Sequence, residues 1–316
     1  MNLKELEYII KIAEERSFTK AAEKLFITPS ALNQQVGRIE KDLGTPLFYR
    51  SRSGCIPTEA GEIYIQTAAD ILRKKKEAYN QIRDLADSRK GMLSIGFPPE
   101  HGTSMFTAVY LEFHKQFPDI SLQAYEASVR QQQKLIAQGV LDVGFLTLLD
   151  WQKTGDEYLH IVSEELLLAL PSSSPICQKA VKRPGGRLPE LNLNELKDEP
   201  FALMYRESTI YEWVDSLFRK HRFVPTVLFE TSRSHTILNI ISNNMCCGLL
   251  SDYYYDPSIP NVSFFCLPDH PTWELAASYK KGSYLSRPAK AFIRLASDYW
   301  NSHKFQPDYC ESAPLS

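Results

Sequence analysis

The 316-residue chain carries 36 basic and 38 acidic side chains, for a net charge of -2. This length exceeds what one hydrophobic core usually holds, so we expect two or three domains. No basic excess over the whole chain indicates nucleic acid, and no apolar run approaches the roughly 20 residues of a membrane span. The first residues, MNLKELEYII, are typical of an amphipathic helix rather than a signal peptide. We therefore expect a cytoplasmic protein with no membrane partner.

The cysteines and histidines form no recognisable metal or redox motif. Six cysteines are scattered without a C-x-x-C pair, and the seven histidines form no H-E-x-x-H. The adjacent Cys246 and Cys247 leave redox sensing open as an alternative, although free cysteines are usually small buried hydrophobes. The sequence thus predicts a reduced chain with no metal and no cofactor.

Two short helices are predicted between Ser17 and Leu43. Apolar side chains in the first half fall on one helical face, at Phe18, Ala21, Ala22 and Leu25. Thr28 suits the cap of a second helix, and Pro29 suits its first position, where no backbone N–H is needed. The second helix is expected to bury Leu32, Val36, Ile39 and Leu43 and to expose Ser30, Asn33, Gln34, Gly37 and Arg38. This pattern indicates a helix-turn-helix that enters a DNA major groove, with an ordinary pair of core helices as the alternative.

The same region has a local excess of positive charge. From Arg16 to Arg52 there are seven basic residues and three acidic ones, enough for a few phosphate contacts. The following segment, LFYRSRSGCIPT, predicts a two-stranded wing with inward-facing Leu47, Phe48 and Ile56. From that wing, Arg50 and Arg52 could reach a phosphate or a narrow minor groove; a solvated hairpin is the alternative.

A long helix is predicted from Thr58 to about Ser88, because this stretch contains no proline and one glycine. Roughly thirty helical residues would extend about 45 Å, which is too long to pack against one small domain. A heptad seam runs along it through Tyr64, Ala68, Ile71, Lys75, Ala78, Ile82 and Leu85. We therefore expect this helix to pair with its copy in a second chain.

Beyond Lys90 the pattern changes to strands that alternate with helices. Strands are predicted at MLSIGF, ISLQAYE, LDVGFL, IVSEELLLALP, PFALMY, TVLFE, GLLS, VSFFCLP and ELAASY. The intervening helices are expected at Ser104–Phe117, Val129–Gln138, Tyr211–His221 and Ser234–Asn243, with a last one at Ala289–Asn301. This order predicts two α/β halves joined by crossing strands, an architecture that closes on a small molecule.

The segment SFTKAAEKLFITPSALNQQVGRIEKDLGTPLFYRSRSG, with TEAG at Thr58–Gly61, closely resembles the signature of LysR-type transcriptional regulators. The rest of the chain resembles the effector domain of that family more loosely, through LDVGF and MCCGLLS. The resemblance implies an α+β multidomain chain with a winged helix-turn-helix at 1–58 and a linker helix at 59–89. It implies a two-lobed, periplasmic-binding-protein-like effector domain at 90–316, with lobe I at about 90–165 and 268–316 and lobe II at about 166–267. It also implies homodimers or homotetramers, a promoter operator in double-stranded DNA, RNA polymerase and a small-molecule effector as partners.

Carried over to this chain, the DNA contacts of the family would come from Thr28, Pro29, Ser30, Asn33, Gln34, Arg38, Arg50 and Arg52. The chain departs from the family, whose members commonly have Gln at the place of Pro29, Ser at Asn33, and Arg or Lys at Gln34. Asn33 and Gln34 can each pair bidentately with an adenine edge, worth about 1–3 kcal/mol apiece. Our hypothesis is that these two amides read bases while Ser30 and Arg38 hold phosphates.

Family effectors bind between the two lobes. The matching positions are Pro98, Glu100, His101, Thr103, Ser104, Ser128, Thr147, Arg206, Ser208, Thr231 and Ser232. A helix N-terminus near Thr103 and Ser104 could hold an anionic group, whereas Glu100 could favour an amine. The sequence therefore favours an amino-acid-like or amphoteric metabolite.

Two other classes of function compete with this interpretation. The chain has no phosphate-binding glycine motif, no G-x-S-x-G elbow and no metal spacing, and Glu100 with His101 lacks a nucleophile. We expect no catalytic residues, so an enzyme is disfavoured. A stand-alone solute-binding protein fits the two-lobed half but not the N-terminal DNA-binding unit or the missing export signal.

Overall fold

The structure is a computed structural model that describes residues 2–51, 54–86 and 90–302. Its contacts divide the chain into two compact units, one over Met1–Arg89 with Ala137–Val140 and the other over Lys90–Ile136 and Leu141–Ser316. Within the described ranges, no helix is long and apolar enough to cross a membrane.

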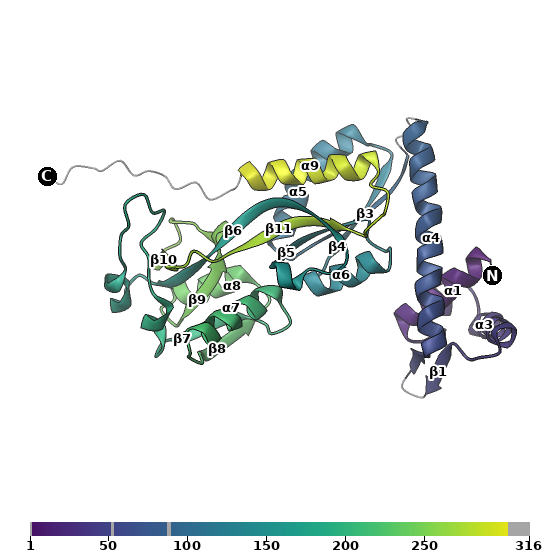
Figure 1. The fold of residues 1–316 in the computed structure, drawn as a ribbon, viewed down its shortest axis with the longest axis horizontal. Coiled ribbons are helices and arrows are strands. Elements are labelled where there is room, and N and C mark those ends of the chain that lie inside the picture. The colour runs from purple at the N-terminus through teal and green to yellow at the C-terminus, as the bar shows by residue number, and fades with distance from the viewer. Residues whose placement is uncertain (1, 52–53, 87–89, 303–316) are drawn as a thin grey trace. The chain divides into compact units, whose positions relative to one another are not determined.

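The first unit is a winged helix-turn-helix (Figure 1). Its elements are α1 (Leu3–Glu15), α2 (Phe18–Lys24), α3 (Pro29–Leu43), β1 (Phe48–Ser51), β2 (Gly54–Pro57) and α4 (Glu59–Leu85). Side chains from α1, α2, α3 and the wing form one apolar core, which includes Ile9, Ala21, Leu32, Val36 and Phe48. Leu43, for which the pattern predicts burial, is 50% exposed, because α3 ends there and Gly44 turns the chain away in a left-handed cap.

Ile56 of the wing faces solvent, whereas the sequence pattern predicts that it faces the core. Strand pairing sets Tyr49 opposite Ile56 and Arg50 opposite Cys55. Tyr49 and Ile56 are therefore both on the outer face and exposed, whereas Cys55 is buried. Because side chains alternate along a strand, this one-residue difference also places Arg50 on the inner face with Cys55.

The second unit is a two-lobed α/β domain. Lobe I contains β3 (Gly91–Phe97), α5 (His101–Gln116), β4 (Ile120–Glu126), α6 (Val129–Ala137), β5 (Val143–Leu148), β11 (Thr272–Tyr279) and α9 (Arg287–Ser302). Lobe II contains β7 (Pro200–Met204), α7 (Thr209–Lys220), β8 (Thr226–Thr231), α8 (Ser234–Ser242), β9 (Cys247–Ser251) and β10 (Val262–Cys266). Short 3₁₀ helices lie at Asp150–Gln152, Pro175–Lys179, Leu193–Leu196 and Asp252–Tyr254.

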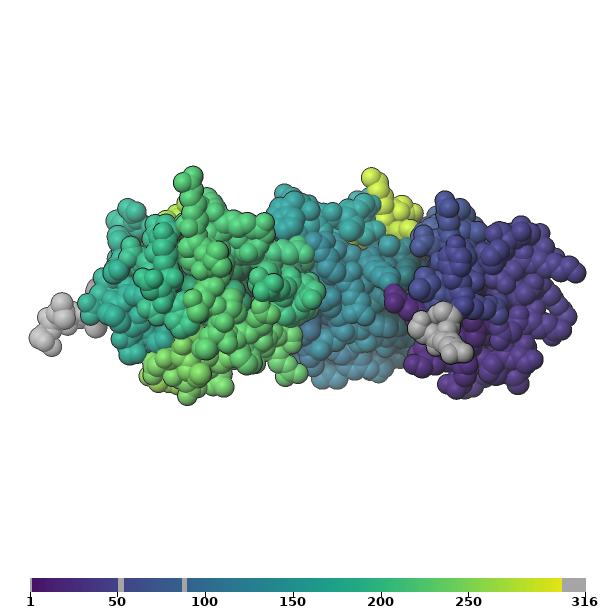
Figure 2. Space-filling view, turned by 90° about the horizontal axis from the view of Figure 1, so that it is seen from below, coloured from purple at the N-terminus to yellow at the C-terminus, as the bar shows by residue number. Residues whose placement is uncertain are grey.

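One long strand, β6 (Glu157–Pro171), connects the lobes (Figure 1). The strand order is β4-β3-β5-β11-β6-β9-β7-β8, and β10 also pairs with β6. From Glu157 to Glu165 the partner of β6 is β11, and from Leu166 onward its partners are β9 and β10. In the space-filling view, blue residues of lobe I lie beside green residues of lobe II within this unit (Figure 2).

Helix α5 begins at His101, three residues earlier than predicted. Glu100 occupies its N-cap position with φ 58° and ψ -78°, a conformation that few residues other than glycine adopt. The earlier start turns His101 inward, where it is 5% exposed. The loop between β3 and α5 thereby becomes one wall of the site described below.

Candidate functional site

Helix α3 presents a polar face on the first unit. Thr28 caps the helix by accepting a hydrogen bond from the Ala31 N–H at 3.2 Å, and Pro29 fills its first position. The cap, together with Gly44 at the other end, fixes both ends of the helix. The side chains of Ser30, Gln34 and Arg38 are exposed on this helix.

Asn33 belongs to a hydrogen-bonded network instead of being free. Its amide nitrogen donates to the Pro29 carbonyl at 2.9 Å, and its oxygen accepts from Arg50 at 2.7 Å. Arg50 also pairs with Glu40 at 3.4 Å and stacks over the Phe18 ring, 4.3 Å from its centroid. Asn33 and Arg50 therefore satisfy part of each other's hydrogen-bonding capacity within the unit.

The predicted DNA residues consequently fall into three groups. Pro29, Ser30, Gln34 and Arg38 are exposed on α3, and Thr28 is its exposed cap. Asn33 and Arg50 are engaged with each other, an interaction over 17 positions that no local sequence pattern reveals. Arg52 lies outside the described residues.

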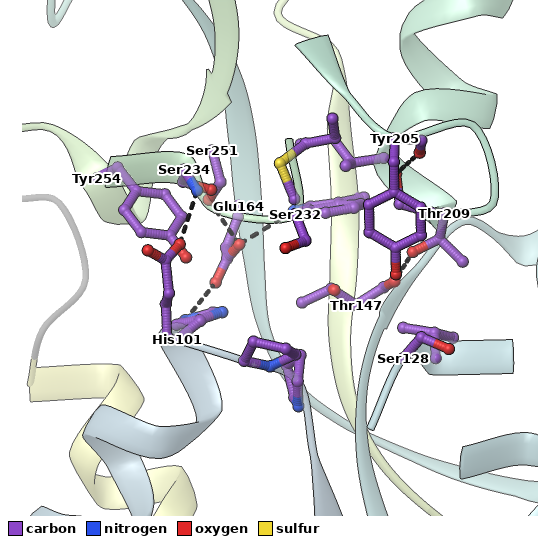
Figure 3. Close-up of a pocket in the computed structure, with 18 residues that line it drawn as sticks. His101, Ser128, Thr147, Glu164, Tyr205, Thr209, Ser232, Ser234, Ser251 and Tyr254 are labelled. Atoms are coloured by element: carbon purple, nitrogen blue, oxygen red, sulfur yellow. Dashed lines mark hydrogen bonds and ion pairs between the residues drawn. The ribbon is translucent and has the colours of Figure 1, made fainter. Parts of the chain in front are cut away.

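A cleft opens between the two lobes of the second unit (Figure 3). Its volume is about 90 Å³, room for roughly six to nine water-sized groups at ~10–15 Å³ each. It is lined by Pro98, Pro99, Glu100, His101, Ser128, Val129, Thr147, Glu164, Met204, Tyr205, Ser208, Thr209, Ile210, Ser232, Ser234, Ser251, Tyr254 and Trp273. These dimensions fit a small metabolite.

A buried carboxyl and a buried imidazole form one wall of the cleft. Glu164 accepts hydrogen bonds from the Ser251 hydroxyl at 2.6 Å and the Trp273 indole at 3.0 Å. Burial raises the pKa of Glu164 to about 7, against the lowering effect of those two donors, and burial lowers the pKa of His101 to about 3. His101 is therefore neutral at physiological pH.

The two groups meet at this wall. His101 Nε2 lies 3.1 Å from Glu164 Oε1 but forms no well-directed hydrogen bond with a described residue. Figure 3 shows the two side chains turned toward each other. Since an imidazole nitrogen without a hydrogen bond is costly to bury, this corner of the cleft can accept a polar group from a ligand.

Glu100 bridges the lobes at the same wall. Its carboxylate accepts the backbone N–H of Ser234, the first residue of α8, at 2.6 Å, and lies 3.1 Å from His235 Nδ1. The Arg233 side chain, at the cap position, makes no capping hydrogen bond to α8. The chain thus supplies its own carboxylate to the positive end of this helix.

A second bridge closes the opposite side of the cleft. Arg130 on α6 donates to both carboxylate oxygens of Glu212 on α7, at 3.0 and 2.7 Å. Gln152 also donates to Glu212 at 2.7 Å, and the Thr209 hydroxyl donates to the Thr147 carbonyl at 3.0 Å. Lobe I and lobe II are therefore held together by direct polar contacts at both sides.

The cleft contains seven of the eleven predicted effector positions, namely Pro98, Glu100, His101, Ser128, Thr147, Ser208 and Ser232. The other four do not line it. Thr103 donates to Glu126, Ser104 is exposed, Arg206 pairs with Glu230 at 3.4 Å, and the Thr231 hydroxyl accepts from the Arg233 N–H. The anion site expected at Thr103 and Ser104 is displaced, because α5 starts earlier and turns both residues away.

Sequence reasoning missed Glu164, Trp273 and Tyr254 in the cleft wall. Glu164 interrupts the apolar part of a predicted strand, IVSEELLLALP, and a carboxylate at a buried strand position was the available signal. Trp273 and Tyr254 offered no such signal, since aromatic residues in strands and loops usually pack in a core.

Removing the charge of Glu100 is expected to weaken the second unit. A Glu100→Gln variant should lose about 1 kcal/mol of unfolding free energy, because a carboxylate at a helix N-terminus contributes about 0.3–2 kcal/mol. Urea unfolding followed by tryptophan fluorescence measures this. Glu126→Gln, which alters an exposed carboxylate of the same lobe, is the control, and an equal loss in both variants would contradict the assigned bridge.

The adjacent cysteines do not resemble a redox centre. Cys246 and Cys247 are both buried, and burial raises the pKa of the Cys246 thiol to about 11 and that of Cys247 further. Because the thiolate is the reactive form, both groups behave as packed hydrophobes at neutral pH.

Comparison with known proteins agrees with both units. Residues 3–62 match the model of the bacterial regulatory helix-turn-helix protein, lysR family, and residues 86–301 match that of the LysR substrate binding domain. The chain is 27% identical over 310 residues to the HTH-type transcriptional regulator YcgK of Bacillus subtilis, covering 94% of each chain. It is 30% identical over 302 residues to the Hca operon transcriptional activator HcaR of Escherichia coli, covering 94% of this chain and 98% of HcaR.

Solved structures share the fold. A full-length, singly substituted OxyR from Pseudomonas aeruginosa aligns with a TM-score of 0.66 and 22% identity, over 94% of each chain. CbnR in complex with its target DNA aligns with a TM-score of 0.55 and 20% identity, over 95% of this chain and 99% of CbnR.

A helix-turn-helix joined to a two-lobed ligand-binding domain defines a DNA-binding transcriptional regulator with an effector domain. The chain belongs to the LysR family of such regulators.

Proposed function

We propose that this chain is a cytoplasmic regulator whose sequence-specific binding to a promoter changes when a small metabolite enters the cleft. The observation that carries this proposal is the cleft between the lobes, lined by apolar side chains with a few hydroxyl and ionisable groups, in a chain that also carries the exposed face of α3. We infer that it acts by binding and without catalysis, as regulators of its family typically do.

Base reading is assigned first to Gln34, because it is exposed on α3 and its amide can pair with an adenine edge. Ser30 and Arg38 would hold phosphates, with Thr28 and Pro29 at the helix start and Arg52 as a further contact. Asn33 would read a base only after Arg50 leaves it, for example to reach a phosphate. This exchange would couple phosphate contact to base contact.

Substitution of Gln34 tests the assignment. Gln34→Ala should weaken binding to the operator by about 1–3 kcal/mol, roughly 5- to 150-fold in Kd, while binding to unrelated DNA changes little. Fluorescence anisotropy with both DNAs measures the two effects. Gln66→Ala, which alters an exposed glutamine on α4, is the matched control. Equal losses of affinity for both DNAs would show that Gln34 contributes to DNA binding in general and does not read a base.

Pairing of α4 with its copy would make the regulator a dimer. The second half of the predicted seam remains exposed in the single chain, with Ile82 at 63% and Leu85 at 88%. Covering these side chains removes apolar surface from water, which supports a homodimer and, by the family pattern, a homotetramer that contacts RNA polymerase. Such a dimer would present two recognition helices to successive turns of DNA.

The cleft favours a small effector with a carboxylate and a second polar group. Ser128 caps α6 and Ser208 caps α7, so two helix N-termini reach the lining, and none of the described lining residues is Lys or Arg. A carboxylate would be held by backbone N–H groups and hydroxyls at these ends, while a hydrogen-bonding group would face His101 and Glu164. Glu100, which is engaged with α8, is less suited to bind an amine than the sequence suggests.

A thermal melt with candidate effectors tests this chemistry. Small amino acids and hydroxy acids should raise the Tm of the wild-type chain by mass action, and their amides or esters, which lack the carboxylate, should not. Equal shifts by acids and amides would contradict a carboxylate site at α6 and α7, without bearing on DNA binding.

A further inference from the structure

A second polar cluster lies where β6 passes from lobe I to lobe II, and none of its three residues lines the cleft. Cys266 ends β10, Glu165 lies on β6, and His270 follows in the loop to β11. Their ligand atoms all lie within 4.8 Å of one another, and His270 Nδ1 is 2.7 Å from Glu165 Oε1. Since Glu165 and His270 are 105 positions apart, no sequence spacing indicated the cluster.

The fold holds these three residues in place through the backbone. Strand β10 runs antiparallel to β6 with Cys266 opposite Leu167, and the Leu166 N–H donates to the Pro271 carbonyl at 2.9 Å. Strand β10 and the loop to β11 therefore follow the same edge of β6, which brings Cys266 and His270 beside Glu165. The sheet therefore sets the backbone positions of the three residues.

We propose that Cys266, His270 and Glu165 form a binding site for a divalent transition-metal ion of the Zn²⁺ or Co²⁺ type. A thiolate, an imidazole and a carboxylate are the donors that Zn²⁺ uses in proteins. Bonds of about 2.0–2.3 Å to a tetrahedral ion place its ligand atoms roughly 3.3–3.8 Å apart. Small side-chain shifts bring the three atoms from their present separations into that range, and the fourth position is left to water or another ligand.

A fourth residue supports the histidine in the way that metal sites require. His270 Nε2 lies 3.5 Å from Glu190 Oε1, and Glu190 accepts from Arg183 at 3.1 Å. Glu190 is also bridged to Cys266 through the backbone. A ligating histidine usually donates its other ring N–H to a carboxylate, which fixes the tautomer and orients the ring; Glu190 supplies that carboxylate.

The backbone at His270 is consistent with a positioned ligand. Its φ is 44°, in the left-handed region that non-glycine residues seldom occupy, and such a residue persists where its surroundings hold it. The His270 side chain is 47% exposed, which leaves a path for an ion to enter. The competing role is an ion-pair clamp of a charged His270 between two carboxylates. In that role the Cys266 thiol, whose pKa burial and the neighbouring Glu165 raise to about 12, stays protonated.

Cobalt titration of the tag-free, full-length chain separates these two roles. A bound Co²⁺ ion with a Cys266 ligand gives a thiolate-to-cobalt charge-transfer band in the near ultraviolet, which we expect to saturate at about one ion per chain. Zn²⁺ should displace the Co²⁺ and remove the band. Neither result depends on DNA or effector binding.

Variants assign the ligands. Cys266→Ser should abolish the band and His270→Asn should weaken Co²⁺ binding at least about tenfold, whereas Glu190→Gln should weaken binding about tenfold with the band retained. The matched controls are Cys246→Ser, another buried thiol, and His160→Asn, another half-exposed histidine beside a carboxylate; both should bind as the wild type does.

Two results would overturn the proposal. One is the lack of a charge-transfer band in the folded wild-type chain, and the other is a band that survives Cys266→Ser. If Cys266→Ser does not fold, as judged by circular dichroism, then His270→Asn decides, because it alters an exposed loop position. Unchanged Co²⁺ affinity in that variant would reject the site.

Discussion

Gly61→Ala is expected to destabilise the DNA-binding unit by at least about 3 kcal/mol, at or above the usual cost of overpacking. A Cβ atom on Gly61 would lie 2.0 Å from the carbonyl oxygen of Leu47. That oxygen cannot move freely, because it accepts the Thr58 N–H at 2.9 Å while the Thr58 hydroxyl donates to Pro46 at 2.8 Å. The substitution therefore forces the wing away from α4.

The two units can be observed separately in this experiment. All the tryptophans lie in the second unit, at Trp151, Trp213, Trp273 and Trp300. In urea, Gly61→Ala should shift the early part of the circular-dichroism transition to lower concentration and leave the tryptophan transition in place. Gly37→Ala is the control, since its Cβ meets open space and should add about 0.5–1 kcal/mol of helix stability. If Gly61→Ala unfolded at the same urea concentration as the wild type, the wing would be able to accommodate the added methyl group, and the prediction would be wrong.

The second large effect is a loss of stability in acid that depends on His101. Burial holds the pKa of His101 near 3, below its unfolded value of 6.5. The unfolded chain thus gains a proton that the folded chain does not, so this contribution to stability is complete above pH 6.5 and is lost as the pH falls toward 3. By pH 5 the loss should reach about 2 kcal/mol, at 1.36 kcal/mol per pKa unit.

The comparison of wild type with His101→Gln isolates this effect. Glu164, the titrating group in contact with His101, has its pKa raised to about 7 by burial and stabilises both proteins as it takes up a proton below that pH. The other facing groups are the aromatic rings of Tyr253, Tyr254 and Trp300. From pH 8 to pH 5, the unfolding free energy of the wild type should fall by about 2 kcal/mol relative to that of His101→Gln. The same change in both proteins would contradict a neutral His101.

The helix-turn-helix could be predicted because its signals are local. Caps at Thr28 and Gly44 and a run of helical-period apolar residues lie within one short segment. The wing was predicted as a hairpin, but the buried residue of its second strand was not. Cys55 and Ile56 are both apolar, so in a four-residue strand the alternation of apolar residues does not show which of them faces the core. That error also hid the inward turn of Arg50 and its bond to Asn33.

In the effector domain, the loops could be predicted but the chemistry of the cleft could not. Ser128, Thr147 and Ser208 follow or precede recognisable elements and do line the cleft. Glu164 and Trp273 meet across 109 positions, and Glu100 reaches Ser234 across 134. Such contacts depend on how the two lobes pack against each other. The periodicity of apolar residues within one strand or helix carries no information about that packing.

The central claim is sequence-specific DNA binding by the polar face of α3, and a salt series of operator binding tests it most directly. Fluorescence anisotropy of labelled DNA from upstream of the coding sequence would be measured against excess unrelated DNA. We predict a complex that survives the competitor and weakens with salt with a log–log slope of about -4 or steeper. Equal affinity for a scrambled operator, or a salt-independent complex, would contradict the account.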